Sequence, residues 1–311
     1  MSGDGFNGPC ALISDKQLGD VTLLEPVTRL LAERSGRPCA LHVKEAFRPL
    51  VGLMAQAAWG PDQRERAALS WTTSWSTRAA WTALRVASRR RGLLVNQPRH
   101  VRWWYRLIFR EVRIEPIGRE YWAKYFWRAL GGEPEAFTPP QLSLPPEDWR
   151  HPELPEGPFL LANPTAAWPS KFWTPKAWAE VMTSAGQGLP WVMTGGGSPE
   201  ERRHCAEIAA LAPAGLIDLA GRTSLKQYLH ALSRARLVTA VDGSAAHLAQ
   251  AFGVSALTIF GPVYPPKWHW PTPRHRALSA FDFSSERLPS AAAVPAQAAL
   301  AEIAALLGEP A

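Results

Sequence analysis

The chain has 311 residues, of which 46% are hydrophobic and 20% are charged, the composition of an ordinary globular protein. The sequence shows no long apolar run, no basic start followed by an apolar segment and no repeat. A transmembrane helix, a secretory signal and a fibrous or repeat architecture are therefore not expected. Cys10, Cys39 and Cys205 lie far apart without metal-ligand spacing, and we expect them to be reduced, mostly buried thiols of a cytosolic protein.

The positive charge is concentrated in the first half of the chain. The formal net charge is +7. Residues 1–150 hold 22 Lys and Arg against 15 Asp and Glu, whereas the remaining residues hold twelve of each. We therefore expect the first half to face an anionic partner. The chain also has 15 tryptophans, and the sequence gives no physical reason for so many.

Short apolar runs alternate with helix-like segments through the first half. Predicted strands are residues 10–14, 38–43, 67–71 and 92–95, and predicted helices are residues 21–34, 45–58, 77–90 and 119–130. This order predicts a parallel sheet covered by helices. Residues 131–157 are rich in Pro, Glu and Gly without periodicity, and we interpret them as an interdomain linker.

The alternation resumes in the second half. Predicted strands are residues 159–163, 191–194, 217–220, 237–241 and 256–260, and predicted helices are residues 175–184, 199–211, 225–234, 245–252 and 291–307. The sequence thus predicts an α/β protein of two domains, residues 1–150 and 151–311. In such proteins the ligand usually binds in a cleft at the carboxyl ends of the strands, so the residues that follow each strand are the candidates for chemistry.

Asp20 opens the first predicted helix, after the first strand. At this place an Asp is often an N-cap that accepts backbone N–H bonds. A carboxylate facing the cleft can instead take the proton of an attacking hydroxyl. The residue by itself does not decide between the two roles.

Lys171 lies in the irregular stretch NPTAAWPSKFW, which follows the first strand of the second half. Thr174 and Pro175 then begin a helix as N-cap and first residue. A lysine near a helix start opposes the helix dipole, and a diphosphate ligand would compensate for it. The alternative is a solvated lysine whose stem packs against tryptophan.

The stretch TGGGSPEE follows another strand, and its glycines allow close approach of the backbone to a ligand or a tight turn. It matches neither the dinucleotide fingerprint nor the P-loop. Ser198 and Glu201 form a capping box with Pro199 between them, which gives Glu201 a structural role. A carboxylate here can also bind a ribose diol, and Glu200 has no assigned role.

The strongest constellation is VDGSAAHLAQA, where a strand ends at Asp242 and a helix of small residues begins at once. Gly243 and Ser244 form the turn, and the first N–H groups of the helix make an anion site suited to phosphate. His247 lies on the first helical turn, within reach of that anion. The alternative is that Asp242 or Ser244 only caps the helix and that His247 packs on the sheet.

Nine arginines and a single acid, Glu111, lie between residues 85 and 113, interleaved with aromatic residues. This composition suits an anionic membrane surface or a phosphorylated lipid or saccharide. It also suits single-stranded nucleic acid, or a solvated helix face with its aromatic residues turned inward. The candidate acceptor or membrane surface consists of Arg89, Arg90, Arg91, Arg102 and Arg106.

Together these blocks resemble a known family, the bacterial ADP-heptose:lipopolysaccharide heptosyltransferases of glycosyltransferase family nine. The resemblance covers most of the chain and rests on residues 18–36, NPTAAWPSKFWTPKAWAEVM, TGGGSPEE, residues 219–254 and LTIFGPVYP. It implies the GT-B fold, two Rossmann-like domains with parallel sheets flanking a central cleft. The first domain would face the acceptor and the second would bind the donor. We also expect the closing helix, residues 291–307, to pack back on the first domain.

The resemblance implies roles for single residues. Asp20 matches the proposed general base, and Lys171 matches a lysine that contacts the donor diphosphate. The implied donor-binding set is Thr165, Lys171, Glu200, Glu201, Asp242, Gly243, Ser244 and His247. The chain departs from the family pattern at residues 243–245, where Gly-Ser-Ala stands in place of Thr-Gly or Ser-Gly.

The expected function is an inverting sugar transfer without cofactor or metal, since the sequence has no Asp-x-Asp pair and no HExxH motif. The expected donor is an ADP-linked heptose, and the expected acceptor is a lipopolysaccharide-core-like or other anionic, phosphorylated lipid-linked saccharide. The enzyme would be cytoplasmic and peripherally bound to the inner membrane, with no nucleic-acid partner. Alternatives are transfer from another nucleotide sugar, a nucleotide-sugar hydrolase or epimerase, and a non-enzymatic binder of anionic lipid or polymer.

Overall fold

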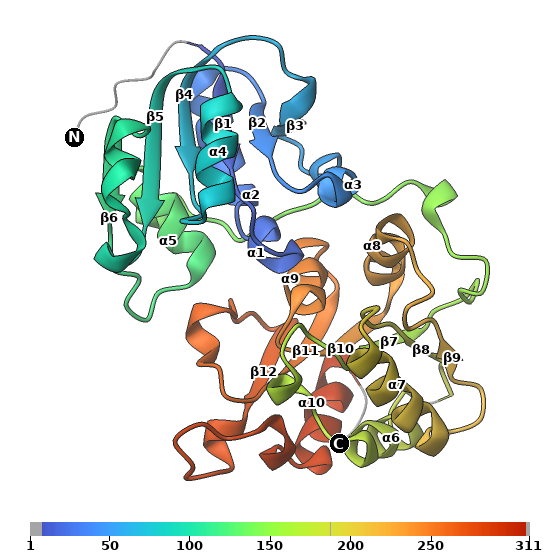
Figure 1. Cartoon of the computed structure of the whole chain (residues 1–311). Helices are drawn as coiled ribbons and strands as arrows, with labels where there is room; N and C mark the ends of the chain where they lie inside the picture. Colours follow the sequence, from blue (N-terminus) through green and yellow to red (C-terminus); the bar gives the residue numbers. More distant parts are fainter. Residues whose placement is uncertain (1–7, 187, 309–311) are drawn as a thin grey trace. The chain divides into compact units, whose positions relative to one another are not determined.

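The computed structural model describes residues 8–186 and 188–308 (Figure 1). The chain divides between Ser143 and Leu144 into two compact units, and this division falls inside the predicted linker. Each unit contains one sheet of six strands, and all the strand pairs within the two sheets are parallel. In the described part of the chain, the helices are too short or too polar to cross a membrane.

Unit 1 is built on a sheet with the strand order β3-β2-β1-β4-β5-β6. Its strands are β1 (Cys10–Ile13), β2 (Cys39–His42), β3 (Ala57–Trp59), β4 (Ala67–Thr72), β5 (Ser88–Val95) and β6 (Glu111–Ile114). Its α-helices are α1 (Leu18–Thr22), α2 (Glu25–Ser35), α3 (Arg48–Val51), α4 (Thr77–Arg85) and α5 (Trp122–Ala129). Short 3₁₀ turns are η1 (Glu45–Phe47), η2 (Gly60–Asp62), η3 (Pro98–His100), η4 (Trp103–Leu107) and η5 (Pro134–Ala136).

Unit 2 repeats the plan with the strand order β12-β11-β10-β7-β8-β9. Its strands are β7 (Leu160–Asn163), β8 (Trp191–Met193), β9 (Ile217–Asp218), β10 (Leu237–Val241), β11 (Ser255–Phe260) and β12 (His275–Ser279). Its α-helices are α6 (Pro175–Ser184), α7 (Pro199–Leu211), α8 (Leu225–Arg234), α9 (Ser244–Ala251) and α10 (Ala296–Leu307). Its 3₁₀ turns are η6 (Glu147–Trp149), η7 (Pro169–Lys171), η8 (Pro265–Lys267), η9 (Ala280–Asp282) and η10 (Ala291–Ala293).

The chain order reverses at the middle of each sheet, between β1 and β4 in unit 1 and between β7 and β10 in unit 2. In doubly wound sheets ligands bind outside the carboxyl ends of the strands at this switch point. All residues of β7, β10 and β11 are buried, as expected for strands covered on both faces. The switch points therefore offer a rigid support for side chains that follow β1 in unit 1 and β7 and β10 in unit 2.

Several predicted elements are confirmed. Helices α6, α7 and α8 match their predicted ranges residue for residue, because Thr174, Ser198 and Ser224 each cap the first turn with a side-chain oxygen. The predicted cysteine state also agrees, since all three thiols are buried and free of disulfides.

The predicted helix at residues 45–58 is wrong. It contains only η1 and the single turn α3, which ends at Gly52, and its last residues join the sheet as β3. The helix predicted for residues 21–34 is broken between α1 and α2, and Pro26 stands in the first turn of α2. A proline lacks the N–H that a continuous helix would need there.

Strands β6 and β12 were not predicted, and the helix predicted for residues 77–90 ends at Arg85. Both strands stand at a sheet edge, where polar side chains hide the apolar signal. The closing helix begins only at Ala296, with Pro295 as its N-cap. Its buried residues Ala299, Ile303 and Leu307 belong to the core of unit 2. Packing of this helix on the first domain stays a prediction.

The linker segment is fastened to the unit on each side of the division. Before it, the Arg29 guanidinium donates to the carbonyl oxygens of Thr138 and Pro139, and the Gln141 N–H donates to Glu25 Oε2 at 2.9 Å. After it, the Glu147 carboxylate lies 3.2 Å from His230 Nε2 and 2.9 Å from Arg234. The free length between the two units is therefore much shorter than the predicted linker.

Candidate functional site

Polar side chains gather at the switch point of unit 2. Asn163 ends β7, and its Nδ2 donates to the carbonyl oxygen of Thr194 at 3.2 Å. Thr165 follows in the same loop and accepts the Gly196 N–H at its hydroxyl at 3.2 Å. Both side chains are buried, so the loops after β7 and β8 are held together beside the end of β10. Thr165, a member of the implied donor-binding set, thus lies at the switch point of unit 2.

Lys171 and Asp242 form the central ion pair of this site. Lys171 Nζ lies 2.7 Å from Asp242 Oδ2, and the aspartate side chain is only 3% exposed. The ammonium group also lies 4.9 Å from the ring centroid of Trp168. From the sequence, a ligand anion was expected to compensate the positive charge of Lys171 near a helix start. The structure adds an anion from the protein itself, the Asp242 carboxylate. Because an ammonium group has three N–H donors, Lys171 can hold Asp242 and bind a further anion.

The start of α9 lies directly after Asp242. Gly243 is its N-cap with a φ of −173°, an extended conformation that any residue adopts. A Cβ added at Gly243 would meet no atom closer than 3.5 Å, so neither backbone strain nor internal packing requires a glycine. A glycine leaves the first N–H groups of α9 open to close approach, which fits the predicted anion site.

Tyr228 is a site residue that the sequence analysis missed. Burial raises the pKa of its phenol to about 12; a side-chain hydrogen bond with Ser244, the first residue of α9, opposes this shift, and Glu201 adds to it. The contact joins α8 to α9 across sixteen positions of sequence. A tyrosine on an amphipathic helix is ordinarily read as core, so no local pattern could have identified it.

His247 faces the ion pair from the first turn of α9. Burial lowers its pKa to about 4; Asp242 raises the value and Lys171 lowers it further. The imidazole is therefore neutral at neutral pH and can donate one N–H without adding a positive charge. Its ring centroid lies 6.2 Å from that of Trp268.

Glu200 and Glu201, the two candidate ribose ligands, differ in what they bind. Glu201 completes the predicted capping box, because its carboxylate accepts the Ser198 N–H at 3.2 Å while its own N–H donates to Ser198 Oγ. It also covers Gly196, where a Cβ would fall 2.1 Å from the carboxylate. Glu200 is exposed and free of such a contact in the described residues. Which of the two carboxylates contacts a ribose stays a prediction.

Asp20 lies on α1, the short helix after β1 at the switch point of unit 1. Its Oδ2 accepts the Gln17 N–H at 3.3 Å, as in the capping role that the sequence analysis weighed. This carboxylate is half-buried, and the two oxygens of a carboxylate can accept several hydrogen bonds. The capping role and the role of a general base are therefore compatible.

A second carboxylate, Asp15, follows the same strand, β1, and was also missed. Its Oδ2 accepts the Ser76 hydroxyl, and its N–H donates to Ser74 Oγ, both after β4. Lys16 Nζ lies 3.4 Å from the ring centroid of Trp75. Burial lowers the Lys16 pKa, an effect that Asp20 and Asp15 oppose. The carboxyl end of β1 is thus a cluster of charged and aromatic side chains.

The predicted arginine surface is distributed over several elements. Arg89 and Arg90 lie in the first residues of β5, and Arg102 and Arg106 lie in the crossover after its last residue. The Arg91 guanidinium donates to the carbonyl oxygens of Ala83 and Val86 at the end of α4, and its role in an acceptor or membrane surface stays a prediction.

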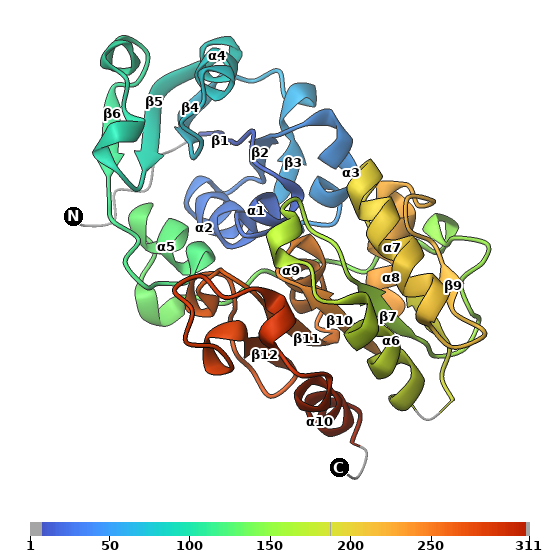
Figure 2. The ribbon, with the colours of Figure 1, turned by 60° about the horizontal axis from the view of Figure 1, so that its bottom comes forward.

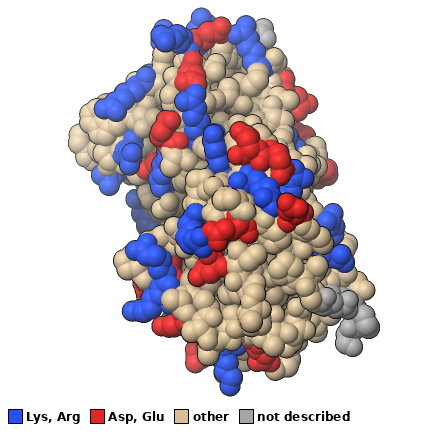
Figure 3. Space-filling model, turned by 90° about the vertical axis from the view of Figure 1, so that its right-hand side faces the viewer, with Lys and Arg blue, Asp and Glu red and all other residues tan. Residues whose placement is uncertain are grey.

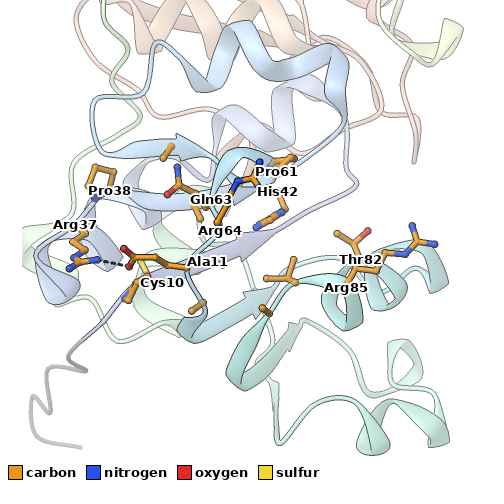
Figure 4. A pocket seen from close by; sticks show the side chains of 18 residues that line it. Cys10, Ala11, Arg37, Pro38, His42, Pro61, Gln63, Arg64, Thr82 and Arg85 are labelled. Atoms are coloured by element: carbon orange, nitrogen blue, oxygen red, sulfur yellow. Dashed lines mark hydrogen bonds and ion pairs between the residues drawn. The ribbon is translucent and has the colours of Figure 1, made fainter.

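Unit 1 also contains a cavity of about 520 Å³ on one face of its sheet. Figure 4 shows the residues that line it from β1, β2, the loop around η2, and α4. Ala11, Ala40 and Ala58 contribute small apolar side chains, and Arg64 and Arg85 contribute charges. The predicted donor and catalytic residues are not part of this lining.

Three histidines with lowered pKa values predict how stability depends on pH. Burial lowers the pKa values of His42, His247 and His269 from 6.5 to about 4. Between these two values the unfolded chain binds more protons than the folded chain, so the free energy of unfolding falls as the pH falls. We expect a loss of roughly 2 kcal/mol per histidine between pH 7 and pH 5, less for the partly exposed His42 and His269.

Urea denaturation at the two pH values measures this loss. His42→Gln should reduce the difference in unfolding free energy between pH 7 and pH 5 by the contribution of one histidine. An unchanged difference in that variant would mean that His42 titrates at its ordinary pKa in the folded protein.

No group of three His, Cys, Asp or Glu side chains suited to a metal ion occurs within residues 8–186 and 188–308. The chemistry available at the unit 2 switch point comes from an ammonium group, helix N–H groups, hydroxyls and a neutral imidazole. Such a set binds a diphosphate and stabilises it as it leaves.

Comparisons with known protein sequences agree with one another. A family model described as glycosyltransferase family 9 (heptosyltransferase) matches residues 122–288. Lipopolysaccharide heptosyltransferase 1 of Pseudomonas aeruginosa is 35% identical over 117 residues, which cover 36% of this chain and 31% of the relative. The match thus spans about a third of the length of that curated relative.

Solved structures resemble the fold over nearly the whole chain. The family 9 glycosyl transferase of Veillonella parvula gives a TM-score of 0.81 at 14% identity, covering 98% of this chain and 99% of that one. The ADP-heptose lipopolysaccharide heptosyltransferase II of E. coli gives 0.76 at 17% identity, covering 96% and 98%. E. coli heptosyltransferase WaaC, solved with ADP, gives 0.69 at 16% identity, covering 93% and 97%. The predicted fold, α/β and GT-B, is confirmed.

Proposed function

The chain belongs to glycosyltransferase family 9 (heptosyltransferase), and we propose that it transfers a sugar from a nucleoside diphosphate to a hydroxyl group of an acceptor. The observation that carries this proposal is the ion pair of Lys171 with the buried Asp242 beside the start of α9, at the switch point of unit 2. A fixed ammonium group and open helix N–H groups in one place suit a diphosphate, both as bound donor and as leaving group.

The residues of the donor site then have the following roles. Lys171 and the first N–H groups of α9 bind the diphosphate oxygens, and Asp242 holds the lysine in place. Direct contact of Asp242 with the diphosphate would bring like charges together, so its role is to position Lys171. His247, neutral at pH 7, donates an N–H to the same oxygens. Thr165 lies beside them, and Glu200 binds the ribose hydroxyls.

Asp20 is the proposed general base. The acceptor hydroxyl loses its proton to the Asp20 carboxylate while its oxygen attacks the anomeric carbon of the donor sugar. The bond from that carbon to the diphosphate breaks at the same time, and its electron pair leaves with the diphosphate. A single displacement inverts the anomeric centre. The positive charges of Lys171 and the helix terminus perform the role that a metal ion has in other transferases, so we propose a reaction without metal or cofactor.

The donor we propose is an ADP-linked heptose, and the acceptor is a phosphorylated, lipid-linked saccharide of the lipopolysaccharide-core type. The names of the E. coli relatives, one an ADP-heptose transferase and one solved with ADP, support this choice. The excess positive charge of the first half suits such an acceptor and peripheral binding at the cytoplasmic face of the inner membrane.

The experiment that tests the proposal is release of ADP from an ADP-linked heptose with and without a lipopolysaccharide-core acceptor. We expect release that depends on the acceptor and forms the glycosylated product. Equal release in both reactions would instead show a nucleotide-sugar hydrolase.

Gly243→Ala provides a test of the anion site that does not depend on stability. Since a Cβ at this position has room and the backbone is extended, we expect a change in unfolding free energy below about 1 kcal/mol. The added methyl group should lower ADP affinity roughly tenfold, because it would stand where the diphosphate approaches the first N–H groups of α9. Calorimetric titration with ADP measures this. Unchanged affinity would place the diphosphate elsewhere.

A further inference from the structure

The segment between Glu65 and Glu111 has an extreme charge pattern. Its 45 residues contain ten arginines, no lysine and no carboxylate. It forms β4, α4, β5, η3 and η4 of unit 1. In the described part of the chain Arg78, Arg85, Arg102 and Arg106 have no ion-pair partner, and all four are exposed. This charge is therefore free to meet an external anion.

Helix α4 is apolar on both its inner and its outer side. Ala79, Ala80 and Ala83 are buried against the sheet. Trp81 and Leu84 point away from it and are 57% and 41% exposed. Helical spacing places Arg78 and Arg85 on the same outer side, three or four residues before and after Trp81. An exposed tryptophan and leucine between arginines are not needed for packing within the unit.

The 3₁₀ turn η4 repeats this arrangement. Tyr105 and Phe109 face the core, where the Tyr105 hydroxyl donates to the carbonyl oxygen of Trp75 at 2.6 Å. Trp103 and Leu107, the outer apolar residues, are 82% and 80% exposed. Arg102 and Arg106 alternate with them, and both are exposed.

Helix α4 and η4 cover the same face of the unit 1 sheet. Ala80 and Ala83 of α4 belong to one apolar cluster with Tyr105 and Phe109. In Figure 1 the crossover between β5 and β6 lies on the same side of the sheet as α4, and Figure 2 agrees. The outer surface of these two elements, which we call the α4–η4 face, thus combines two tryptophans and two leucines with arginines. By contrast, Figure 3 shows another surface, on which acidic and basic side chains alternate.

From this we infer that the α4–η4 face docks on an anionic phospholipid bilayer. Tryptophan and leucine side chains insert at the level of the headgroups, and arginines contact the lipid phosphates while their stems lie along the apolar boundary. Arg85 also lines the cavity of Figure 4. The inference deepens the proposed function, because it assigns a defined surface to the peripheral membrane binding proposed there.

The composition favours a bilayer over other partners. A nucleic acid would use stacking on aromatic rings, but half of the exposed apolar side chains here are leucines. A second copy of the chain would bring its own free arginines against these, and like charges facing each other are unfavourable. An anionic bilayer satisfies both the charge and the apolar side chains.

Sedimentation with vesicles of phosphatidylcholine, with or without phosphatidylglycerol, tests the inference. We expect the wild-type protein to bind the anionic vesicles and to bind neutral ones much more weakly. The variants W103S/L107S and R102Q/R106Q should each lose roughly tenfold or more in partitioning onto the anionic vesicles. Arginine replacement should also reduce the dependence of binding on salt.

Matched control variants remove the same kinds of side chain outside the α4–η4 face. Leu211→Ser removes a leucine that is 57% exposed in unit 2, and R48Q/R203Q removes two exposed arginines. Both should bind vesicles as the wild type does, and thermal unfolding confirms that all variants fold. Losses in the controls as large as those in the test variants would overturn the inference. So would wild-type binding that does not require phosphatidylglycerol.

Two further results would replace the bilayer by another partner. A change in oligomeric mass in W103S/L107S with unchanged vesicle binding would show an interface between copies of the chain. Tighter binding of a single-stranded oligonucleotide, lost in the same variants, would show a nucleic-acid surface. ADP titration of the wild type tests the proposed donor site independently of the proposed membrane surface. Failure to bind ADP contradicts the proposed donor site and leaves the vesicle result standing, and the reverse also holds.

Discussion

Asp20→Asn is expected to reduce the rate of sugar transfer by about two to four orders of magnitude, the usual contribution of a general base. An amide cannot take the proton of the acceptor hydroxyl at neutral pH, so attack on the anomeric carbon would lose its proton acceptor. ADP affinity should stay unchanged, because the residues proposed to bind the donor all belong to unit 2. Single-turnover transfer and calorimetric ADP titration of the same preparation measure the two effects.

The structure indicates that Asp20→Asn changes the stability of the protein only slightly. The Asp20 carboxylate accepts the Gln17 N–H at 3.3 Å, and an asparagine side chain keeps an oxygen that can accept it. We therefore expect a change in unfolding free energy below about 1 kcal/mol. Gln17→Ala is the matched control, because it removes the other side chain of this capping box and leaves both carboxylates in place.

Asp15 is the competing base. Its carboxylate lies after the same strand and accepts the Ser76 hydroxyl. Asp15→Asn should retain most of the activity if Asp20 takes the proton. An inactive Asp15→Asn together with an active Asp20→Asn would reverse the assignment.

Lys171→Met is expected to weaken ADP binding roughly ten- to hundredfold, the value of one or two hydrogen bonds to a charged group. It should also destabilise the protein by about 3–5 kcal/mol, because Asp242 is left buried without its counter-charge 2.7 Å away. Titration with ADP and urea denaturation report the two losses separately.

A double substitution separates binding from folding. In K171M/D242N the buried charge is removed with its partner, so the stability should largely return while ADP affinity stays low. Lys176→Met, an exposed lysine of the next helix, should change neither property. Full ADP affinity in the double variant would show that Lys171 serves only the fold.

The sequence predicted best those elements whose beginnings and ends are set locally. Helices α6, α7 and α8 each follow a Ser or Thr cap, and the first two continue with a proline, so the physical cause of their boundaries lies within a few residues. Strand β10, a fully buried run that is apolar except for Thr239, also agrees with its predicted range.

Prediction failed where pairing partners decide the structure. Residues 57–59 follow a helix-like run but pair with β2, and Arg89 and Arg90 belong to a strand because β4 lies beside them. Neither local propensity nor periodicity contains that information.

The candidate site was likewise predicted only in part. The residues after each strand, among them Thr165, Lys171 and Asp242, were found because a doubly wound sheet places its ligands there. The ion pair between Lys171 and Asp242 joins residues 71 positions apart, and no local pattern encodes it. The contact of Tyr228 with Ser244 was missed for the same reason.

The most direct measurement of the central claim is calorimetric titration of the wild-type chain with ADP, UDP, GDP and CMP, without and then with magnesium. The account predicts that ADP binds most tightly, that magnesium does not change its affinity, and that Lys171→Met weakens it. Absence of binding by all four nucleotides, or binding that requires magnesium, would contradict a donor site built on Lys171 and the start of α9.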